Sequence, residues 1–210
     1  MGKKKNGRTN IWLWVVIAAA VLALAGVGVY AAMPKDVPQD EVLSGTYYVQ
    51  IDVKDYGSIT AELYADKAPI TVANFLKLVD EKFYDGLTFH RIIEGFMIQG
   101  GDPNGNGTGG SEVKIKGEFK ANGVENDLSH VRGVLSMARS NAYNSASSQF
   151  FIMHADALYL DGQYAAFGKV LSGMDVVDAI CENVPVKDGN GTVSRENQPV
   201  ITSIVRIDKP

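Results

Sequence analysis

Apolar and polar residues alternate over residues 46–64, on both sides of a Tyr56-Gly57 break. Because successive side chains of a strand point to opposite faces, this period of two predicts two strands joined as a hairpin. Residues 68–80 change to helical spacing, with Pro69 suited to a first turn and Val72, Phe75, Leu76 and Val79 along one face. We therefore expect a hairpin followed by an amphipathic helix.

The remainder of the domain alternates in shorter stretches. The pattern predicts a second helix at 174–182 and further strands at 88–93, 96–99, 112–115, 133–137, 149–153, 165–170 and 199–207. Many short strands, glycine-rich turns and two helices indicate a mainly β fold, a closed antiparallel barrel whose open ends the helices cover. No internal repeat is visible.

The N-terminal segment has no such alternation. Residues 11–32 are 22 consecutive residues without a charge, and a helix of that length spans a hydrocarbon core of about 30 Å. A cluster of basic residues, Lys3, Lys4, Lys5 and Arg8, flanks this run only on its N-terminal side, which places the N-terminus in the cytoplasm. We expect a cytoplasmic segment 1–10, a transmembrane signal anchor 11–32, a tether 33–45 and a domain 46–210 outside the cytoplasm.

The apolar run has two other interpretations. Small residues around Val29-Tyr30-Ala31 are compatible with a cleaved secretory signal, although signal cores are usually shorter. A buried core helix is disfavoured because the run is apolar on every face. The uncleaved anchor, with the lipid bilayer as partner of residues 11–32, is the preferred prediction.

Charge and cysteine content narrow the function classes. The chain has 210 residues and a net charge of −4; without the four basic residues at Lys3, Lys4, Lys5 and Arg8, 16 basic residues face 24 acidic ones, about −8. An acidic surface argues against nucleic acid as a partner. The single cysteine, Cys181, lies in the second predicted helix and excludes an internal disulfide.

Two segments rich in glycine and asparagine resemble known ligand-binding motifs. Residues 105–110 match GxGxxG, but a dinucleotide site needs that loop to begin a helix, and the following residues alternate like a strand. The segment from Asp102 begins like a calcium loop, but its twelfth position is Val113, where a bidentate glutamate is required. We interpret both as turns, since Asn and Gly readily adopt left-handed backbone.

The three histidines, His90, His130 and His154, do not have the i, i+4 spacing that places two metal ligands on one helix face. A metal site assembled across strands stays open as an alternative. No serine lies in the elbow motif typical of a hydrolase nucleophile. The residue types alone therefore favour neither metal nor nucleophilic chemistry.

Four blocks carry a family resemblance: TFHRIIEGFMIQGGDPNGNGTGG (88–110), GVLSMAR (133–139), SSQFFI (147–152) and LDGQYAAFGKV (160–170). In this order and spacing they resemble the cyclophilin family of peptidyl-prolyl isomerases, over about residues 47–207. The resemblance implies a closed eight-stranded antiparallel barrel capped by two helices. It also implies proline-containing polypeptides as partners, with no cofactor and no metal.

The resemblance assigns roles to particular residues. It implies that Arg91 is the catalytic arginine, assisted by Gln99 and Phe96. The residues that it places around the substrate are His90, Met97, Ala138, Arg139, Gln149, Phe151, Leu160, Tyr159, Tyr164 and Phe167. Of these, Phe96, Met97, Phe151 and Leu160 would form the proline pocket, although as apolar residues they equally fit barrel core. Ala138 and Arg139 would offer backbone to the residue before the proline.

Three positions depart from the family pattern. Tyr159 stands where many cyclophilins have tryptophan, Tyr164 where they often have histidine, and Arg139 where asparagine is frequent. These changes leave cyclosporin binding and sequence preference around the proline unassigned.

Together these features predict a membrane-anchored, monomeric isomerase domain that rotates Xaa-Pro bonds of exported or surface proteins. A proline-recognising binding module or holdase with little catalysis is the main alternative. A secreted hydrolase is a third.

Overall fold

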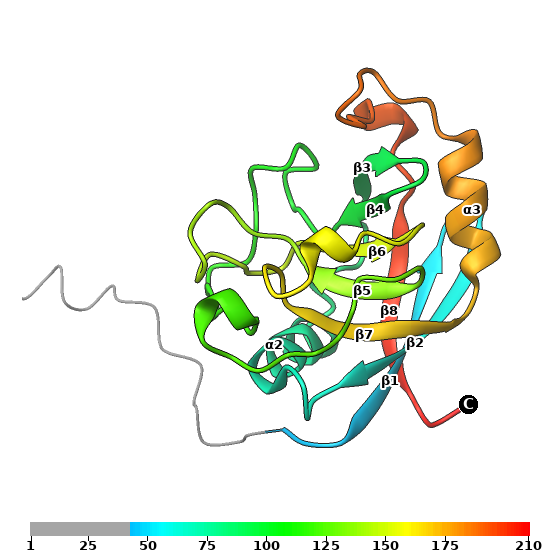
Figure 1. Cartoon of the computed structure of the whole chain (residues 1–210). Coiled ribbons are helices and arrows are strands. Elements are labelled where there is room, and N and C mark those ends of the chain that lie inside the picture. The colour runs from blue at the N-terminus through cyan, green and yellow to red at the C-terminus, as the bar shows by residue number, and fades with distance from the viewer. Residues whose placement is uncertain (1–42) are drawn as a thin grey trace, which may run out of the picture. The chain divides into compact units, whose positions relative to one another are not determined.

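The computed structural model describes residues 43–210. Eight antiparallel strands form one sheet (Figure 1): β1 (Thr46–Val53), β2 (Gly57–Tyr64), β3 (Phe89–Ile93), β4 (Met97–Gly100), β5 (Val134–Met137), β6 (Phe150–Met153), β7 (Ala166–Ser172) and β8 (Ile201–Ile207). The helices are α2 (Pro69–Asp80) and α3 (Met174–Asn183), with three 3-10 turns η1 (Lys120–Asn122), η2 (Leu158–Leu160) and η3 (Arg195–Asn197).

The predicted segments 1–10 and 11–32, and all but the last three residues of the predicted tether, lie outside the described residues. Within residues 43–210, neither helix has the length and apolar character that crossing a membrane requires.

The sheet curls until its edges meet. The strand order is β3-β4-β6-β5-β7-β2-β1-β8, so β3 and β8 are the edge strands. Thr88 and Val200 form an isolated antiparallel bridge between these edges. The backbone N–H of Ile201 also donates to the Leu87 carbonyl at 2.8 Å. The curled sheet thereby acquires an inner and an outer face.

The hairpin, both helices and nearly all the predicted strands are confirmed within one or two residues of their ends. The predicted strand 112–115 is wrong. Only Ile115 pairs, in a single bridge to Ala146. Of those four residues only Ile115 is buried, so the alternation of this segment does not correspond to a continuous apolar face.

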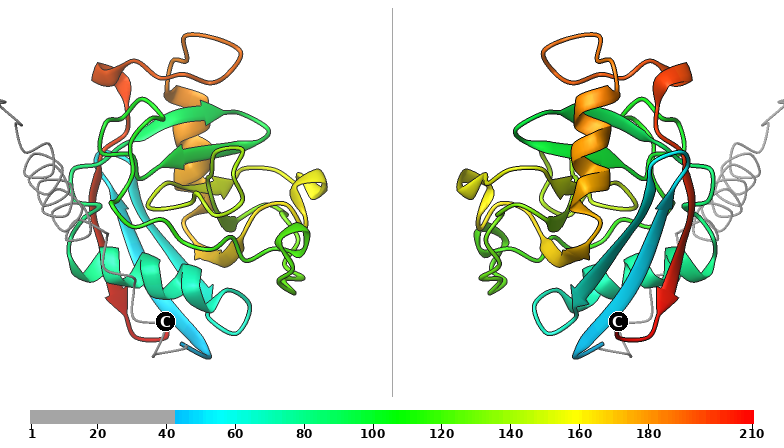
Figure 2. Two further views of the ribbon diagram at one scale, coloured as in Figure 1. Left: turned by 90° about the vertical axis from the view of Figure 1, so that its left-hand side faces the viewer. Right: turned by 90° about the vertical axis from the view of Figure 1, so that its right-hand side faces the viewer.

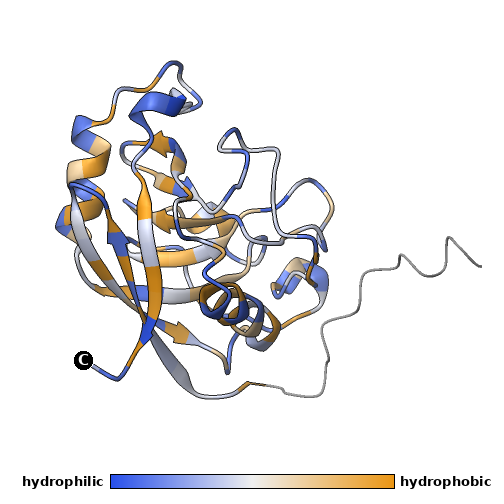
Figure 3. Ribbon diagram, turned by 180° about the vertical axis from the view of Figure 1, so that it is seen from behind, coloured by the Kyte–Doolittle hydropathy of each residue, from blue (hydrophilic) through white to orange (hydrophobic). Residues whose placement is uncertain are grey.

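A distant carboxylate caps the first helix. Ala68, the N-cap residue of α2, has no capping side chain. Glu118, 2% exposed, instead accepts hydrogen bonds from the backbone N–H groups of Ile70 at 3.0 Å and Thr71 at 2.7 Å. A negative charge at this end also interacts favourably with the helix dipole. The alternating polar and apolar residues of α2 (Figure 3) then direct its apolar face to the sheet.

The second helix begins at a glycine in the left-handed region. Gly173 has φ +92°, and a Cβ there would lie 2.4 Å from the Ser58 carbonyl oxygen, so only glycine fits this close approach. Val177, Ile180 and Cys181 are the buried side of α3, and Cys181 is a free thiol. Figure 2 shows α3 and α2 at different ends of the curled sheet, and both contribute side chains to the same core.

Buried apolar side chains divide into two clusters, one on each face of the sheet. The inner core contains Phe75, Phe150 and Phe167 with many aliphatic residues. The outer cluster comprises Met97, Val134, Phe151, Met153, Ala157, Leu160 and Ala166, with Phe96, Ala138 and Tyr164 packed on it. Strand alternation makes this division, because Phe150 and Ile152 point inward whereas Phe151 and Met153 point outward.

Candidate active site

Four paired residues form a row across the outer face of the sheet. Arg91 on β3 is opposite Gln99 on β4, Gln99 is opposite Phe151 on β6, and Phe151 is opposite Ser136 on β5. Directly opposed residues in antiparallel strands project from the same face. The row therefore brings a guanidinium, an amide, a phenyl ring and a hydroxyl together from four separate strands.

A chain of hydrogen bonds orients the polar end of this row. Arg91 Nε donates to the Asn190 carbonyl at 2.8 Å, and Nη1 donates to Gln99 Oε1 at 3.3 Å. Gln99 Nε2 donates to Gln149 Oε1 at 2.9 Å, and Gln149 Nε2 donates to the Gly109 carbonyl at 2.7 Å. Every amide in the chain thus has a defined orientation. Arg91 keeps its Nη2 donors without a protein partner among residues 43–210.

The apolar end of the row is the outer cluster. Met97, Phe151 and Leu160 are nearly buried, at 1%, 5% and 8% exposure. Phe96 and Tyr164 are half-buried beside them, and the Tyr164 ring meets Phe151 edge-on, with 6.1 Å between centroids. This apolar pocket therefore begins at Met97, on the strand next to Arg91, and continues to Phe151, two strands from Arg91.

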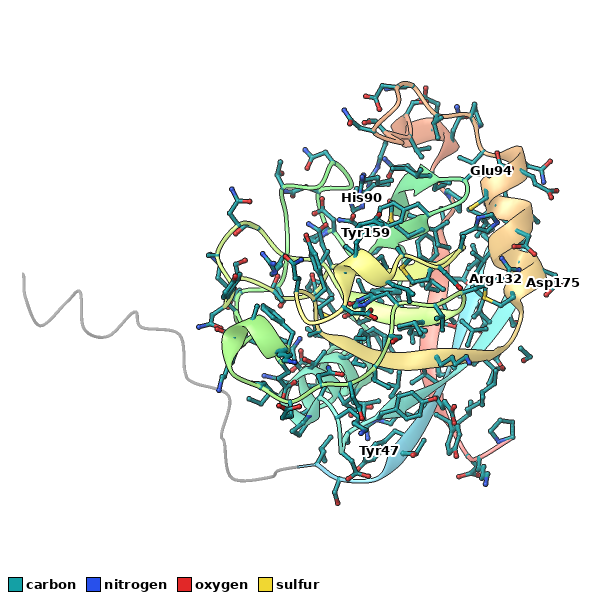
Figure 4. All side chains as sticks on the ribbon, viewed as in Figure 1. Tyr47, His90, Glu94, Arg132, Tyr159 and Asp175 are labelled. Atoms are coloured by element: carbon teal, nitrogen blue, oxygen red, sulfur yellow. The ribbon has the colours of Figure 1, made fainter. Side chains whose placement is uncertain are left out.

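An exposed aromatic forms the rim of this pocket. Tyr159 in η2, which is labelled in Figure 4, is 68% exposed. Its ring stacks on Phe96 with 6.2 Å between centroids. Leu158 beside it is 59% exposed. Apolar surface left open next to a concave apolar site is typical of a surface that contacts a ligand.

A buried polar group supports Phe151 from behind. The His130 ring stacks on Phe151 at 6.1 Å, its Nδ1 lies 2.8 Å from Asp161 Oδ1, and its Nε2 lies 3.0 Å from Ser136 Oγ. Burial lowers the pKa of His130 more than the neighbouring Asp161 raises it. The neutral imidazole therefore donates from Nδ1 to Asp161 and accepts the Ser136 hydroxyl at Nε2.

This Ser-His-Asp arrangement has the order of contacts of a hydrolytic triad, but Ser136 and His130 are both 0% exposed. A substrate carbonyl cannot reach a hydroxyl that is covered on all sides. The arrangement is thus a support for the pocket. No motif in the sequence indicates this arrangement, because Asp161 is 31 positions from His130.

The Asp102 loop is explained by backbone hydrogen bonds. Its buried carboxylate accepts N–H groups from Asn104 at 2.8 Å, Asn106 at 3.0 Å and Gly107 at 2.6 Å. Burial raises the pKa of Asp102, but these hydrogen bonds outweigh it and hold the pKa below its ordinary value. The loop positions the Gly107 and Gly109 carbonyls that receive Gln149. In the described part of the chain, no cluster of three His, Cys, Asp or Glu side chains is arranged for a metal ion.

Comparison with known proteins identifies the family. The model of the family "Cyclophilin type peptidyl-prolyl cis-trans isomerase/CLD" matches residues 48–207. The chain belongs to this family. Peptidyl-prolyl cis-trans isomerase B of Bacillus subtilis is 49% identical over 123 residues, which are 59% of this chain and 82% of that protein. The chain is accordingly a peptidyl-prolyl cis-trans isomerase.

Solved cyclophilin structures agree with the fold. A crystal structure of a cyclophilin type isomerase from Cryptosporidium parvum matches with a TM-score of 0.69 and 32% identity, and covers 79% of this chain and 100% of that one. A second crystal structure of that protein, in the presence of the dipeptide Ala-Pro, matches with a TM-score of 0.67 and 33% identity, over 77% and 99% of the two chains.

Most of the residues assigned by the cyclophilin resemblance lie together on the outer face. They are Arg91, Phe96, Met97, Gln99, Ala138, Gln149, Phe151, Tyr159, Leu160 and Tyr164. Phe167 does not lie there. It is 0% exposed in the inner core, 5.2 Å from the Phe75 ring, because it follows the outward-facing Ala166 by one strand position. His90 is buried beside a second cavity, next to Arg91.

Arg139, one of the cyclophilin departures, has a structural role. Its guanidinium lies 4.5 Å from the centre of the Tyr164 ring, 5.0 Å from Tyr143 and 5.2 Å from Phe119. It also donates to the Gln163 carbonyl at 2.9 Å. These cation–π contacts favour one orientation of Tyr164. The arginine thus braces the ring that meets Phe151.

Proposed function

We propose that this cyclophilin-type isomerase acts on Xaa-Pro bonds of exported or surface proteins and that Arg91 supplies its catalytic hydrogen bond. The observation that carries the chemistry is the row in which a fixed guanidinium lies two strands from Phe151 in the apolar pocket. An apolar ring seated on Met97, Phe151 and Leu160 would bring its amide nitrogen towards Arg91.

The reaction needs only a rotation. Turning an Xaa-Pro bond breaks amide resonance, with a barrier of about 18–20 kcal/mol, and exchange without catalyst takes tens to hundreds of seconds. As the bond twists, the prolyl nitrogen loses conjugation and regains a lone pair. A donor aimed at that nitrogen therefore interacts more strongly with the twisted form than with the planar one, which is the condition for catalysis.

Arg91 is suited to this task. Its guanidinium stays protonated and presents several donors in a fixed plane. Asn190 and Gln99 hold Nε and Nη1, so the Nη2 donors are presented without loss of orientation. If hydrogen bonding and apolar contact together lower the barrier by about 7 kcal/mol, the rate rises roughly 10⁵-fold. Rotation forms no covalent bond and transfers no proton.

Arg91 variants test this chemistry in the full-length chain. We expect Arg91→Ala to lower kcat/KM by roughly 10²-fold or more, the usual effect of losing a transition-state donor, with an unchanged melting temperature. Arg91→Lys should restore little of the lost kcat/KM, because a single ammonium group does not reproduce the planar guanidinium that Asn190 and Gln99 hold in place. Arg206→Ala is a matched control, since that arginine pairs with Asp80 away from the site. Near wild-type turnover of Arg91→Ala would remove Arg91 from the mechanism.

The same assay separates the enzyme from a proline-binding holdase. Exchange of a short proline peptide, measured by NMR with wild-type protein, should be accelerated over buffer. Binding of the peptide without acceleration would favour the holdase instead.

Location outside the cytoplasm is proposed from the uncharged run at residues 11–32, preceded by basic residues only. In this proposal the run anchors the chain in the lipid bilayer and holds the isomerase domain near emerging polypeptides. Membrane fractions of cells that express the full chain should contain protein with an intact N-terminus, and external protease should reach the domain. A soluble form that begins at Ala32 or Met33 would overturn the anchor.

A further inference from the structure

A second cavity lies on the other side of Arg91 from the proline pocket. It has a volume of about 560 Å³ and shares Arg91 and Gln99 with the row. Its walls come from the loop 104–107 and from residues 187–198. Three charged side chains line it, Arg91, Lys187 and Arg195, and all three are basic.

Hydrogen bonds tie the two walls together. Gln198, 7% exposed, donates through Nε2 to the Gly105 carbonyl at 2.8 Å and to the Val193 carbonyl at 3.1 Å. Its Oε1 accepts the Thr88 hydroxyl at 2.5 Å. Arg195 packs against Gly105 so closely that a Cβ there would lie 1.9 Å from Nη1. The cavity is therefore a built feature of the fold.

The floor of the cavity is polar. His90 is 5% exposed, and neither of its ring nitrogens has a hydrogen-bond partner among residues 43–210. Burial lowers the pKa of His90, and the neighbouring Arg91 acts in the same direction against the opposing effect of Asp102. The imidazole is neutral at pH 7, so the charge of the cavity comes from its three basic side chains.

This positive lining stands out on an acidic chain, in which 24 Asp and Glu outnumber 20 Lys and Arg. Two exposed carboxylates lie close enough to interact with it electrostatically, Asp188 with Arg91 and Glu196 with Lys187, and they offset part of its charge. Asp188 accepts backbone N–H groups of Asn190 at 2.9 Å and Thr192 at 3.2 Å within its own loop, and neither Asp188 nor Glu196 lines the cavity. A basic recess continuous with the active site selects for an anionic part of the substrate.

We infer that this cavity receives an aspartate or glutamate side chain of the polypeptide substrate, about three residues from the isomerised proline. This inference rests on the proposed role of the row. Arg91 and Phe151 are two strands apart, about 10 Å at the usual strand spacing. Since an extended chain advances about 3.3 Å per residue, three residues span that distance.

The test compares peptides that differ only in charge. Each peptide has one proline and either Glu or Gln placed two, three or four residues before or after it. Exchange is followed by NMR with the full-length chain, so that no coupling protease adds its own preference. At one position we expect kcat/KM to be about 5- to 10-fold higher with Glu, and this ratio should shrink in high salt.

Variants assign the preference to the cavity. The Glu-to-Gln ratio should fall to about 1 in the Arg195→Gln, Lys187→Gln double variant, whereas Arg206→Gln should keep it. Arg195→Glu should instead favour a peptide with Lys at the same position. Because each ratio is taken within one variant, a general loss of activity does not alter it.

Two results overturn the inference: a ratio of 1 at every position with wild-type protein, or a preference that survives the double variant. If the Gln peptides are still accelerated, only the preference for an acidic residue has failed, and the proposed chemistry of Arg91 stands. If wild-type protein accelerates no peptide at all, the row is not the isomerising site, and the proposal that the second cavity binds an acidic residue fails as well.

Discussion

Phe150 and Phe151 are neighbours in the chain, yet they belong to regions with different tasks. Phe150 is 0% exposed and packs edge-on against Phe75 and Tyr84 in the inner core. Phe151 points to the outer cluster, against His130 and Tyr164, on the face that carries Arg91. One pleated strand thus supplies both the fold and the pocket. The alternation of side chains therefore separates stability from function here.

The inner core and the outer cluster also differ in how completely other elements cover them. Elements on every side cover the inner core, including α2 and α3. The outer cluster is smaller, and Tyr159 and Leu158 at its rim remain exposed to solvent. Loss of a side chain should therefore create a sealed cavity in the inner core but an opening to solvent in the outer cluster.

Alanine substitution of the two phenylalanines tests this division most strongly. We expect Phe150→Ala to lower the free energy of unfolding by about 4 kcal/mol, as is usual for a buried ring. Phe151→Ala should cost roughly 2 kcal/mol, because the smaller outer cluster can relax. Its kcat/KM should nevertheless fall about 10- to 100-fold, since the proline ring loses a wall of its pocket. Urea titration and the peptide assay measure the two effects.

A milder Phe150→Leu variant keeps this comparison measurable if Phe150→Ala fails to fold. Equal loss of activity per folded molecule in the Phe150→Leu and Phe151→Ala proteins would contradict the separation of the two faces.

Ser136 tests how the outer pocket is supported. Ser136→Ala leaves His130 Nε2 buried without a donor, which should lower the free energy of unfolding by about 1–3 kcal/mol. A several-fold lower kcat/KM should accompany this change, because the His130 ring stacks directly on Phe151. Ser58→Ala is the control, since the exposed Ser58 hydroxyl bonds only Asp52 and its loss should be nearly silent. Unchanged stability of Ser136→Ala would mean that the histidine finds another partner.

Mild acid should weaken the fold by a smaller amount. Burial lowers the pKa of both His90 and His130 in the folded protein, whereas the unfolded chain takes up a proton at its ordinary value of about 6.5. Their contribution to stability is therefore complete above pH 6.5 and is lost as the pH falls towards the folded values. Urea titrations at pH 7.5 and 5.5 should differ by on the order of 1 kcal/mol.

His90→Gln isolates the contribution of His90 to this pH dependence of stability, since glutamine does not titrate. That variant should lose less stability than wild type between the two pH values. An identical pH dependence would assign the effect to other groups.

Periodicity predicted the elements that bury a continuous apolar face. The hairpin, α2 and α3 follow from their spacing of apolar residues, and each has a full side in the core. Residues 112–115 alternate equally well, but only Ile115 is buried, so hydropathy alone could not exclude a strand there. The Glu118 cap of α2 was equally invisible, because its partners are 47 and 48 positions away.

The site was predictable where it lies in contiguous motifs. Arg91, Phe96 and Gln99 share one segment, and the resemblance identified them together. The resemblance named Phe167 too, but the neighbouring Ala166 occupies the outward position. The support from His130, Ser136 and Asp161 depends on contacts between a loop, strand β5 and the turn after η2, which no local pattern contains. The basic cavity likewise depends on contact between residues 104–107 and 187–198.

The position of β8 has a consequence for how the domain is made. This strand pairs with β1, about 150 residues earlier, and the bridge from Val200 to Thr88 joins the two edges of the sheet. During synthesis β1 therefore leaves the ribosome long before its outer partner and presents an unpaired edge until residues 201–207 follow. Such non-local pairing slows folding and exposes the nascent chain to association with others. An enzyme that isomerises prolyl bonds thus depends, in its own folding, on a strand that is synthesised about 150 residues after the strand with which it pairs.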